Sequence, residues 1–395
     1  MITISNHPIW KTVSSAKKPF HRARFFLAKQ FAKTLPREAF IGITGSVGKT
    51  TTAKACELVL AQKYQTISTS YSPNLDPIFN IPITILKKSP KVQKVVLEMG
   101  IEYPGEMEYY LSFIKPATAI VTRVSMAHSE FLGSVDQIAQ EKGLLVKELP
   151  KDGTAILNYD DPLVRQLSEK TEASVVYFGL NEKHCHVWAT NVRIHNFQTL
   201  FELNYGVERV EIKSKLLGRH QVYPLLAAAA LGMNEGVGLL QVKKALESLE
   251  GVEHRLQVLE GFNDSVVLDD TYNSSPVAVL EALETMNELP ARRRIAVLGE
   301  MRELGSFSEH AHRDIARKIF ADKVDLVILG TGDAQIIGDE LVNLGFVPER
   351  IESGLTNPQI VSKLLKILAK GDVVLVKASR LVRMDEIVRK ITSTH

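Results

Sequence analysis

The distribution of apolar and polar positions divides the chain into stretches with different periods. Short apolar runs at residues 39–44, 95–97 and 117–124 are typical of buried strands, and residues 50–61 show helical spacing. Strands that alternate with helices in this way predict a parallel sheet with helices on its faces.

A different pattern covers residues 185–216, where apolar and polar residues alternate with a period of two. This alternation indicates antiparallel strands, either at the edge of the first sheet or in a flap beside it. An alanine-rich stretch at residues 220–232 then returns to helical spacing.

A second block of alternating strands and helices begins near residue 258. The expected elements are strands at 265–269, 294–298, 325–330 and 372–377, with helices at 276–287, 308–320 and 358–369. We therefore expect an α/β fold with a mostly parallel sheet in a central domain, residues 38–257, and a Rossmann-like C-terminal domain, residues 258–395.

The first 37 residues form a basic arm. They contain eight Lys or Arg and no Asp or Glu, which leaves 40 basic against 45 acidic residues in the remainder. Residues 20–34 place apolar side chains at near-helical spacing between the basic ones. Such a helix either contacts a membrane surface or a partner protein, or packs on the next domain through Phe25, Phe26 and Leu27.

Composition narrows the class of protein further. Hydrophobic residues make up 45% of the 395 positions and charged residues 24%, as in ordinary globular proteins. We find no apolar run of about 18 residues and no secretory signal pattern. Cys56 and Cys185 offer neither a disulfide framework nor zinc spacing, so we expect a cytoplasmic protein. Basic charge confined to one arm argues against a nucleic-acid partner.

The strongest local signal is the sequence GITGSVGKTTT at residues 42–52. It follows a strand and opens a helix, which is the context of a P-loop, and its glycines let the backbone wrap around phosphates. We expect Lys49 to reach the β- and γ-phosphates and the Thr50 hydroxyl to bind Mg²⁺. Ile43 stands where the strict spacing has glycine, and a P-loop alone does not name a reaction.

Three further side chains are candidates for the same site. Glu98 ends one strand and His128 follows another after a short loop, and ligands of open α/β sheets bind at such strand ends. The alternatives are a solvated glutamate and an exposed loop histidine. Lys142 lies in an expected helix at residues 135–148, where composition gives it no special role.

Several motifs follow the P-loop in a fixed order: EMG (98–100), PGE (104–106), AH (127–128), QEKG (140–143), LNYDDP (157–162), GRH (218–220), HR (254–255), LDDTYN (268–273), VLGEM (297–301) and LVKASR (375–380). In this order they resemble the Mur ligase family, the ATP-dependent amide-bond ligases of cell-wall synthesis. Within the family the likeness is greatest to the MurF type, which adds D-alanyl-D-alanine to the UDP-N-acetylmuramoyl-tripeptide. The resemblance covers residues 38–395.

The resemblance implies roles for individual residues. Lys49 and Thr50 match the P-loop lysine and the Mg²⁺-binding threonine, and Glu98 and His128 match ligands of a second Mg²⁺. Lys142 matches a lysine that is carbamylated in several members, and a carbamate is an anion that suits a metal site. With Arg255, which matches an arginine directed at the ATP phosphates, the catalytic set is Lys49, Glu98, His128, Lys142 and Arg255.

The resemblance also implies contacts with ATP and the substrates. Asp270 matches a residue that contacts the ribose, and Lys377 and Arg380 match a motif near the amine substrate. The expected ATP-binding residues are Gly45, Ser46, Val47, Gly48, Lys49, Thr50, Thr51, Gln221, Arg255, Asp270, Tyr272 and Asn273. The expected ligands are ATP, two Mg²⁺ ions and small-molecule or peptide carboxylate and amine substrates.

Two departures from the MurF pattern leave the substrate open. MurF-type ligases begin with a UDP-sugar-binding domain of about 80–100 residues, whereas residues 1–37 are too short to form a core of that kind. We therefore expect this domain to be missing. The GRH motif is followed by Gln221 and Pro224 where the family has asparagines near adenine, so we expect looser selectivity for the base.

Three functions follow as alternatives. The first is a MurF-like ligase, which forms an acyl phosphate from ATP and a carboxylate and then an amide from the incoming amine. The second applies the same chemistry to a different carboxylate outside peptidoglycan. The third is a non-catalytic, regulatory ATP-binding partner, against which the retained Lys49, Glu98 and Arg255 argue.

Overall fold

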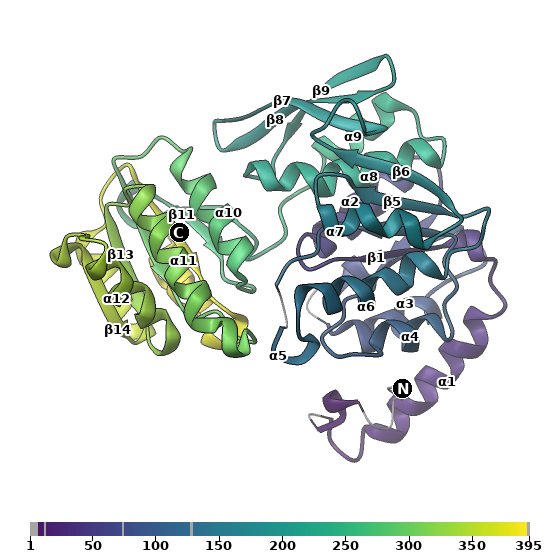
Figure 1. Cartoon of the computed structure of the whole chain (residues 1–395), viewed down its shortest axis with the longest axis horizontal. Coiled ribbons are helices and arrows are strands. Elements are labelled where there is room, and N and C mark those ends of the chain that lie inside the picture. Colours follow the sequence, from purple (N-terminus) through teal and green to yellow (C-terminus); the bar gives the residue numbers. More distant parts are fainter. Residues whose placement is uncertain (1–6, 12, 73–74, 127–128, 393–395) are drawn as a thin grey trace.

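The computed structural model describes residues 7–11, 13–72, 75–126 and 129–392. The expected metal ligand His128 lies outside the described residues. Two α/β domains lie side by side, a central domain and a C-terminal domain (Figure 1). Within the described residues, no helix has the length and apolar character needed to span a lipid bilayer.

The central domain is built on a nine-stranded sheet with the order β2-β3-β1-β4-β5-β6-β7-β8-β9. Neighbouring strands from β2 to β7 run parallel, and the β7–β8 and β8–β9 pairs are antiparallel. The strands are β1 (Phe40–Thr44), β2 (Thr66–Ser68), β3 (Lys94–Glu98), β4 (Thr118–Val121), β5 (Thr154–Asn158), β6 (Ser174–Gly179), β7 (Val187–His195), β8 (Gln198–Tyr205) and β9 (Glu208–Ser214). The expected antiparallel strands therefore extend the edge of the first sheet.

Helices cover both faces of this sheet. One face carries α2 (Lys49–Leu60), α8 (Val222–Asn234) and α9 (Leu239–Glu247), and the other carries α3 (Pro77–Leu86), α4 (Glu106–Leu111) and α6 (Val135–Lys147). The short helices α5 (Ser129–Leu132) and α7 (Pro162–Arg165) lie in loops after β4 and β5. Because β1 lies between β3 and β4, the loops that follow these three strands meet at one edge of the sheet.

The C-terminal domain has a six-stranded sheet with the order β10-β11-β15-β12-β13-β14, antiparallel only between β10 and β11. Its strands are β10 (Gln257–Gly261), β11 (Ser265–Asp270), β12 (Arg293–Leu298), β13 (Leu326–Gly330), β14 (Ile351–Leu355) and β15 (Asp372–Lys377). The helices α10 (Pro276–Asn287), α11 (Ser308–Ala321) and α12 (Gln335–Asn343) cover one face, and α13 (Asn357–Ile367) and α14 (Asp385–Ile391) cover the other. This arrangement confirms the expected mostly parallel α/β fold.

Two edge strands, β10 and β14, were not expected from the sequence pattern. Four of the five residues in β10 and all five in β14 keep at least part of their surface in solvent. Edge strands of this kind need no buried apolar run, so they leave a weak signal in the sequence.

The basic arm folds against the central domain. Its helix α1 (Lys18–Ala32) packs on α3, with Phe25 buried beside Trp10 and Phe79. Phe26 and Leu27 are exposed, so the interpretation in which they face a protein core together with Phe25 is wrong for these two residues.

Candidate active site

The P-loop has backbone angles that only glycine adopts readily. Gly45 has a φ of +150°, and a Cβ atom on it would lie 2.0 Å from the Thr122 hydroxyl oxygen. Gly48 has a φ of +80° and precedes the first residue of α2. Ile43, at the position where the strict spacing has glycine, is fully buried inside β1. The substitution therefore falls in the strand and leaves the loop itself unchanged.

The loop after β4 holds the P-loop in place. The Thr122 hydroxyl donates to the Val47 carbonyl at 2.7 Å, and the Ser46 amide donates to the Arg123 carbonyl at 2.6 Å. The Ser46 hydroxyl donates to the Ser125 carbonyl at 2.9 Å and accepts from the Ser125 amide at 3.0 Å. These bonds fix the P-loop backbone, whose amides and the adjoining α2 N-terminus favour an anion.

Four expected catalytic or metal-binding residues meet at this loop. The Thr50 hydroxyl lies 3.2 Å from a Glu98 carboxylate oxygen and accepts a hydrogen bond from the Arg255 guanidinium at 3.1 Å. The Lys49 amine donates to the Ser46 carbonyl at 3.3 Å. Burial lowers the pKa of Lys49, and the Arg255 charge lowers it further, whereas Glu98 and Glu102 act in the opposite direction.

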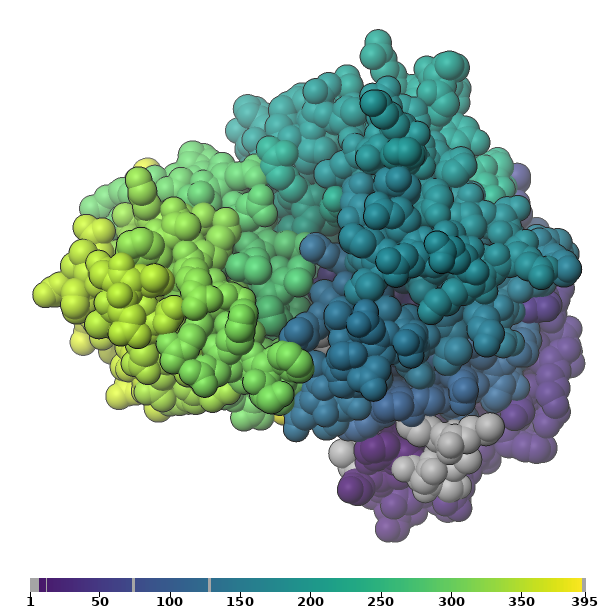
Figure 2. Space-filling view, in the orientation of Figure 1, coloured from purple at the N-terminus to yellow at the C-terminus, as the bar shows by residue number. Residues whose placement is uncertain are grey.

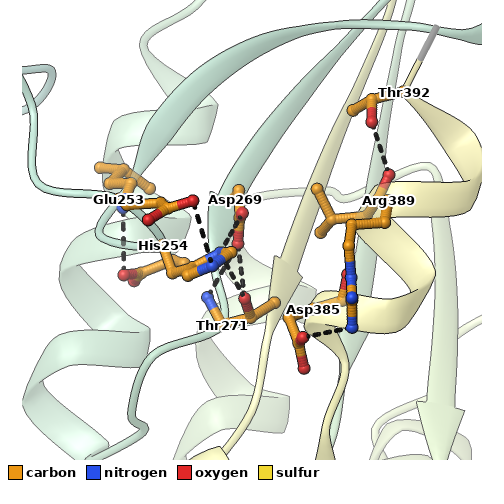
Figure 3. Close-up of polar contacts among 10 residues, drawn as sticks. Glu253, His254, Asp269, Thr271, Asp385, Arg389 and Thr392 are labelled. Carbon is orange, nitrogen blue, oxygen red and sulfur yellow. Dashed lines mark hydrogen bonds and ion pairs between the residues drawn. The ribbon is translucent and has the colours of Figure 1, made fainter. Parts of the chain in front are cut away.

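His254, the residue before Arg255, is hydrogen-bonded to the end of β11 (Figure 3). The His254 Nδ1–H donates to the buried Asp269 carboxylate at 2.7 Å, and Asp269 also accepts from the Thr271 hydroxyl at 2.6 Å. His254 has a φ of +61°, a backbone angle that is uncommon outside glycine. These contacts hold the positive φ at His254 and so direct Arg255 toward the P-loop. The sequence motifs contained His254, but nothing in the sequence indicated this positioning contact.

The residue after Arg255 and the end of β15 together bind the carboxylate of Asp270. One Asp270 carboxylate oxygen accepts from the Leu256 amide at 3.1 Å, and the other accepts from the Lys377 amine at 2.6 Å. Lys377 is buried and donates its second bond to the Asn273 carbonyl at 2.9 Å. Lys377 therefore shapes the loop that carries Asp270 and Asn273.

The Tyr272 ring contacts two arginines that were expected in the site. The Arg255 guanidinium lies 4.1 Å from the centre of the Tyr272 ring, and the Arg380 guanidinium lies 5.4 Å from it. Such contacts orient a guanidinium without neutralising it. Both guanidinium groups thus lie beside one ring in the wall of the cavity.

Lys142 is a buried lysine on α6. Its pKa lies well below the usual value because of burial, and the neighbouring Lys49 charge lowers it further, while Glu106 and Glu141 oppose the shift. These surroundings favour the neutral amine over the ammonium ion.

A cavity of about 360 Å³ has walls from both domains, but Lys142 is not among the described residues that line it. Its lining includes most of the expected residues: Ser46, Val47, Gly48, Lys49, Thr50, Thr51, Glu98, Gln221, Arg255, Asp270, Tyr272, Asn273, Lys377 and Arg380. Arg123 and Glu281 also line the cavity, although neither was expected there. Their side chains form an ion pair at 2.5 Å across the domain boundary. These two residues are 158 positions apart, and no motif connects them.

The basic arm reaches the wall of this cavity through His7. The buried His7 Nε2 lies 2.5 Å from a carboxylate oxygen of Glu106, which lines the cavity. The other Glu106 oxygen accepts from the amides of Glu102 and Tyr103 at 2.5 and 2.9 Å. Glu106 belongs to the PGE motif, but its partner His7 lies 99 positions away and no motif connects the two residues.

These features define a class of protein: a nucleotide-dependent enzyme with a P-loop in one α/β domain, an arginine from the segment that leads into the second domain and a carboxylate from the second sheet. Comparison with known families agrees with this class. The model of the Mur ligase middle domain matches residues 43–232, and that of the Mur ligase, glutamate ligase domain matches residues 254–380.

Individual relatives match most of the chain. The UDP-N-acetylmuramoyl-tripeptide–D-alanyl-D-alanine ligase of Escherichia coli is 30% identical over 89% of this chain and 76% of its own length. The ligase of the same name from Bacillus subtilis is 28% identical over 92% of this chain and 78% of its own.

Solved structures show the same fold. MurF from Acinetobacter baumannii superposes with a TM-score of 0.83 at 22% identity, over 93% of this chain and 80% of its own. MurF ligase from Thermotoga maritima in complex with ADP superposes with a TM-score of 0.81 at 25% identity, over 93% of this chain and 82% of its own. The chain belongs to the Mur ligase family, and it is an ATP-dependent carboxylate–amine ligase.

Proposed function

We propose that this enzyme joins a carboxylate of the UDP-N-acetylmuramoyl-tripeptide to the amine of D-alanyl-D-alanine, with conversion of ATP to ADP and phosphate. The observation that carries the proposal is the meeting of Lys49, Thr50, Glu98 and Arg255 at one cavity. The names of the curated relatives supply the pair of substrates.

The P-loop and the segment around Arg255 would bind ATP from two sides. The backbone of residues 45–51, Lys49 and Arg255 would surround the phosphates, because they present amide donors and two cations. Asp270 would accept from the ribose, and Gln221, Tyr272 and Asn273 would lie beside the nucleoside.

Mg²⁺ fits the oxygen atoms next to the P-loop. The Thr50 hydroxyl and the Glu98 carboxylate lie 3.2 Å apart, and Mg²⁺ prefers oxygen ligands of this kind. Bound there, the ion would neutralise phosphate charge. For a second ion we propose Glu98, His128 and a carbamylated Lys142 as ligands.

The proposed carbamate on Lys142 can be tested directly. A neutral amine is the form that adds to carbon dioxide, and burial favours that form because it lowers the pKa of Lys142. We expect the wild type to show a carbamate resonance in NMR spectra with isotopically labelled bicarbonate, and Lys142→Gln to lose it. Lys147→Gln, an exposed position on the same helix, is the control and keeps the resonance. A wild type without the resonance would contradict the carbamate.

The reaction would proceed in two transfers. A carboxylate oxygen of the first substrate attacks the γ-phosphorus of ATP, the bond to ADP breaks and an acyl phosphate forms. The amine nitrogen then attacks the acyl carbon, phosphate leaves, and the nitrogen loses a proton as the amide forms. Lys49 and Arg255 would stabilise the charge that develops on the transferred phosphoryl group.

The first experiment tests the role of Lys49. We expect Lys49→Ala to reduce ATP-dependent phosphate release by at least about 100-fold, because it removes a charge that acts in the transition state. Lys54→Ala is the matched control, since Lys54 lies on the same helix and donates instead to the Glu250 carbonyl. If Lys49→Ala kept full turnover, the P-loop would not be the catalytic phosphate site.

The second experiment identifies the substrates. Phosphate release and product mass are measured with D-alanyl-D-alanine and either the UDP-linked tripeptide or the same peptide without its UDP-sugar. Product from the UDP-linked pair supports the proposal. Product from the free peptide alone replaces the proposed acid with a non-UDP substrate. ATP binding without phosphate release from a broader matrix of acids and amines would favour a regulatory role.

A further inference from the structure

We propose that helix α1 docks this enzyme on an anionic membrane surface. This role is separate from the ligase reaction, because α1 does not line the cavity and leaves one of its own faces uncovered.

The outer face of α1 is open to solvent and mainly apolar, with the exposed Gln30 among its apolar residues. Phe20, Phe26 and Leu27 are 63%, 62% and 55% exposed, and the exposed Ala23 lies between them on the same side of the helix. The opposite side, with Phe25, packs into the core of the central domain. Packing on the protein therefore accounts for one side of α1 and leaves three large apolar residues on the other.

Basic residues border this apolar face on both sides. At 100° per residue, Arg22, Lys29 and Lys33 follow one edge, and Lys17 and Arg24 follow the other. The Arg24 guanidinium lies 4.6 Å from the centre of the Phe20 ring. Residues 7–37 contain no Asp or Glu, so no acidic side chain of the arm itself neutralises these charges.

This combination matches the interface of an anionic bilayer. An interfacial helix buries an apolar face among the headgroups while its flanking cations attract the anionic lipids. A second copy of the chain is a poorer occupant, because a symmetric contact would bring two copies of the same basic edges together. Charge complementarity therefore favours the lipid surface.

The position of α1 is compatible with catalysis on the membrane. The helix lies at the periphery of the central domain, on the side away from the C-terminal domain, and the arm forms part of the outer surface (Figures 1 and 2). α1 packs on α3, whose first residue Pro77 lines the cavity. Docking would thus bring that side of the cavity near the headgroups and leave the C-terminal domain free to move.

The test measures cosedimentation of the full chain with lipid vesicles. We expect binding to phosphatidylcholine vesicles that contain about one-third phosphatidylglycerol, at least about 10-fold stronger than to phosphatidylcholine alone, and weaker at high salt. Replacement of the apolar face by Phe20→Ser, Phe26→Ser and Leu27→Ser should reduce binding at least about 10-fold. The charge variant Arg22→Glu, Lys29→Glu and Lys33→Glu should do the same.

Matched controls carry equal changes at other exposed positions. Leu240→Ser, Val342→Ser and Val347→Ser control for the apolar face, and Lys213→Glu, Lys244→Glu and Lys366→Glu control for the charge. Both controls should bind as the wild type does, and circular dichroism checks that every variant is folded. A wild type that ignores anionic vesicles, or α1 variants that bind as tightly as the controls, would overturn the proposal. So would an apolar-face variant that only abolishes self-association in light scattering.

Discussion

At the scale of single residues, the buried His312 supports the loop that follows β12 through hydrogen bonds. Its Nδ1–H donates to the Ser308 carbonyl at 2.7 Å, and its Nε2 accepts from the Met301 amide at 3.1 Å. Met301 belongs to the VLGEM motif that follows β12. Protonation of His312 would replace the acceptor by a second donor, so this arrangement requires the neutral ring.

A pH dependence of stability follows from His312. Burial lowers the pKa of His312 below its unfolded value near 6.5, although Ser308, Asp333 and Glu300 partly oppose the shift. A lowered pKa means that the unfolded state takes up the proton first, so stability falls as the pH drops from about 6.5 through the folded value. We expect denaturant unfolding to show this loss in the wild type.

Substitutions of His312 and of a control histidine test whether His312 causes the loss of stability at low pH. His312→Gln should lower the free energy of unfolding by about 1–3 kcal/mol at neutral pH, because one buried group loses its partner. It should also flatten the decline below pH 6.5. His310→Gln, at an exposed position on the same helix, should change neither. An unchanged decline in His312→Gln would assign the acid sensitivity to other groups.

Single site residues were predicted best from the sequence where they belong to a motif that fixes the backbone around them. Lys49 and Thr50 were indicated by the glycine pattern, and the structure places both at the cavity. The partners of Lys377 could not be foreseen, because its ion pair with Asp270 joins residues 107 positions apart. Its proposed contact with the amine substrate stays a prediction, as do the catalytic roles of the other site residues.

At the scale of elements, Asp161 shows how one carboxylate connects a helix end to a loop of the active site. One oxygen accepts from the Leu163 and Val164 amides at 2.9 and 3.1 Å and caps α7, while the other accepts from the Val124 amide at 2.8 Å. Val124 follows β4, in the loop that supports the P-loop. The LNYDDP motif therefore has a structural role that its sequence did not reveal.

The contribution of Asp161 can be measured by substitution. Asp161→Ala should reduce the free energy of unfolding by about 2–4 kcal/mol, because it removes a helix cap and leaves the buried Val124 amide without its acceptor. Asp161→Asn keeps one acceptor oxygen and should lose less. Asp152→Ala, at an exposed position, is the control in the same thermal or denaturant assay. Equal stability of the alanine variant and the wild type would show that the loop does not depend on this carboxylate.

The elements themselves were foreseeable to different degrees. The runs that became β1 and β15 are entirely buried, so their apolar character marks them in the sequence. The strand β14 has no fully buried residue and gave no signal. The half-exposed strands β7, β8 and β9 were still indicated by their alternation, so a strand is missed when it has neither a buried run nor a regular alternation.

At the scale of the whole molecule, the two domains meet through polar contacts and through Ile194, Phe197 and Leu217, which pack in the apolar cluster of the C-terminal domain. Besides the Arg123–Glu281 pair in the cavity, Arg219 and Glu288 form an ion pair at 2.7 Å across the boundary. The Glu130 amide also donates to the Glu303 carbonyl at 3.1 Å. Pairs of this kind are 69 or more positions apart and have no sequence signature, which is why two α/β domains could be predicted but not their contact.

The Arg219–Glu288 pair lies outside the cavity and offers a test of domain closure. Its partly exposed ion pair is worth roughly 0.2–1 kcal/mol, so Arg219→Glu should shift the open and closed populations by about 1.4- to fivefold toward the open form. Small-angle X-ray scattering without nucleotide should then report a larger radius of gyration. The exchanged pair Arg219→Glu with Glu288→Arg should restore the wild-type value. A single variant indistinguishable from the wild type would show that the pair does not influence closure.

The division of the site between two sheets has a consequence for how the molecule unfolds. Three of the four apolar clusters lie within one domain, and only a few central-domain residues join the fourth, so each domain can act as a separate cooperative unit. A nucleotide held by the P-loop on one side and by Arg255 and Asp270 on the other would act as a thermodynamic crosslink between these units. Its binding free energy, about 2.7 kcal/mol at a concentration 100 times Kd, would be lost when either domain melts, and two separate transitions would merge into one.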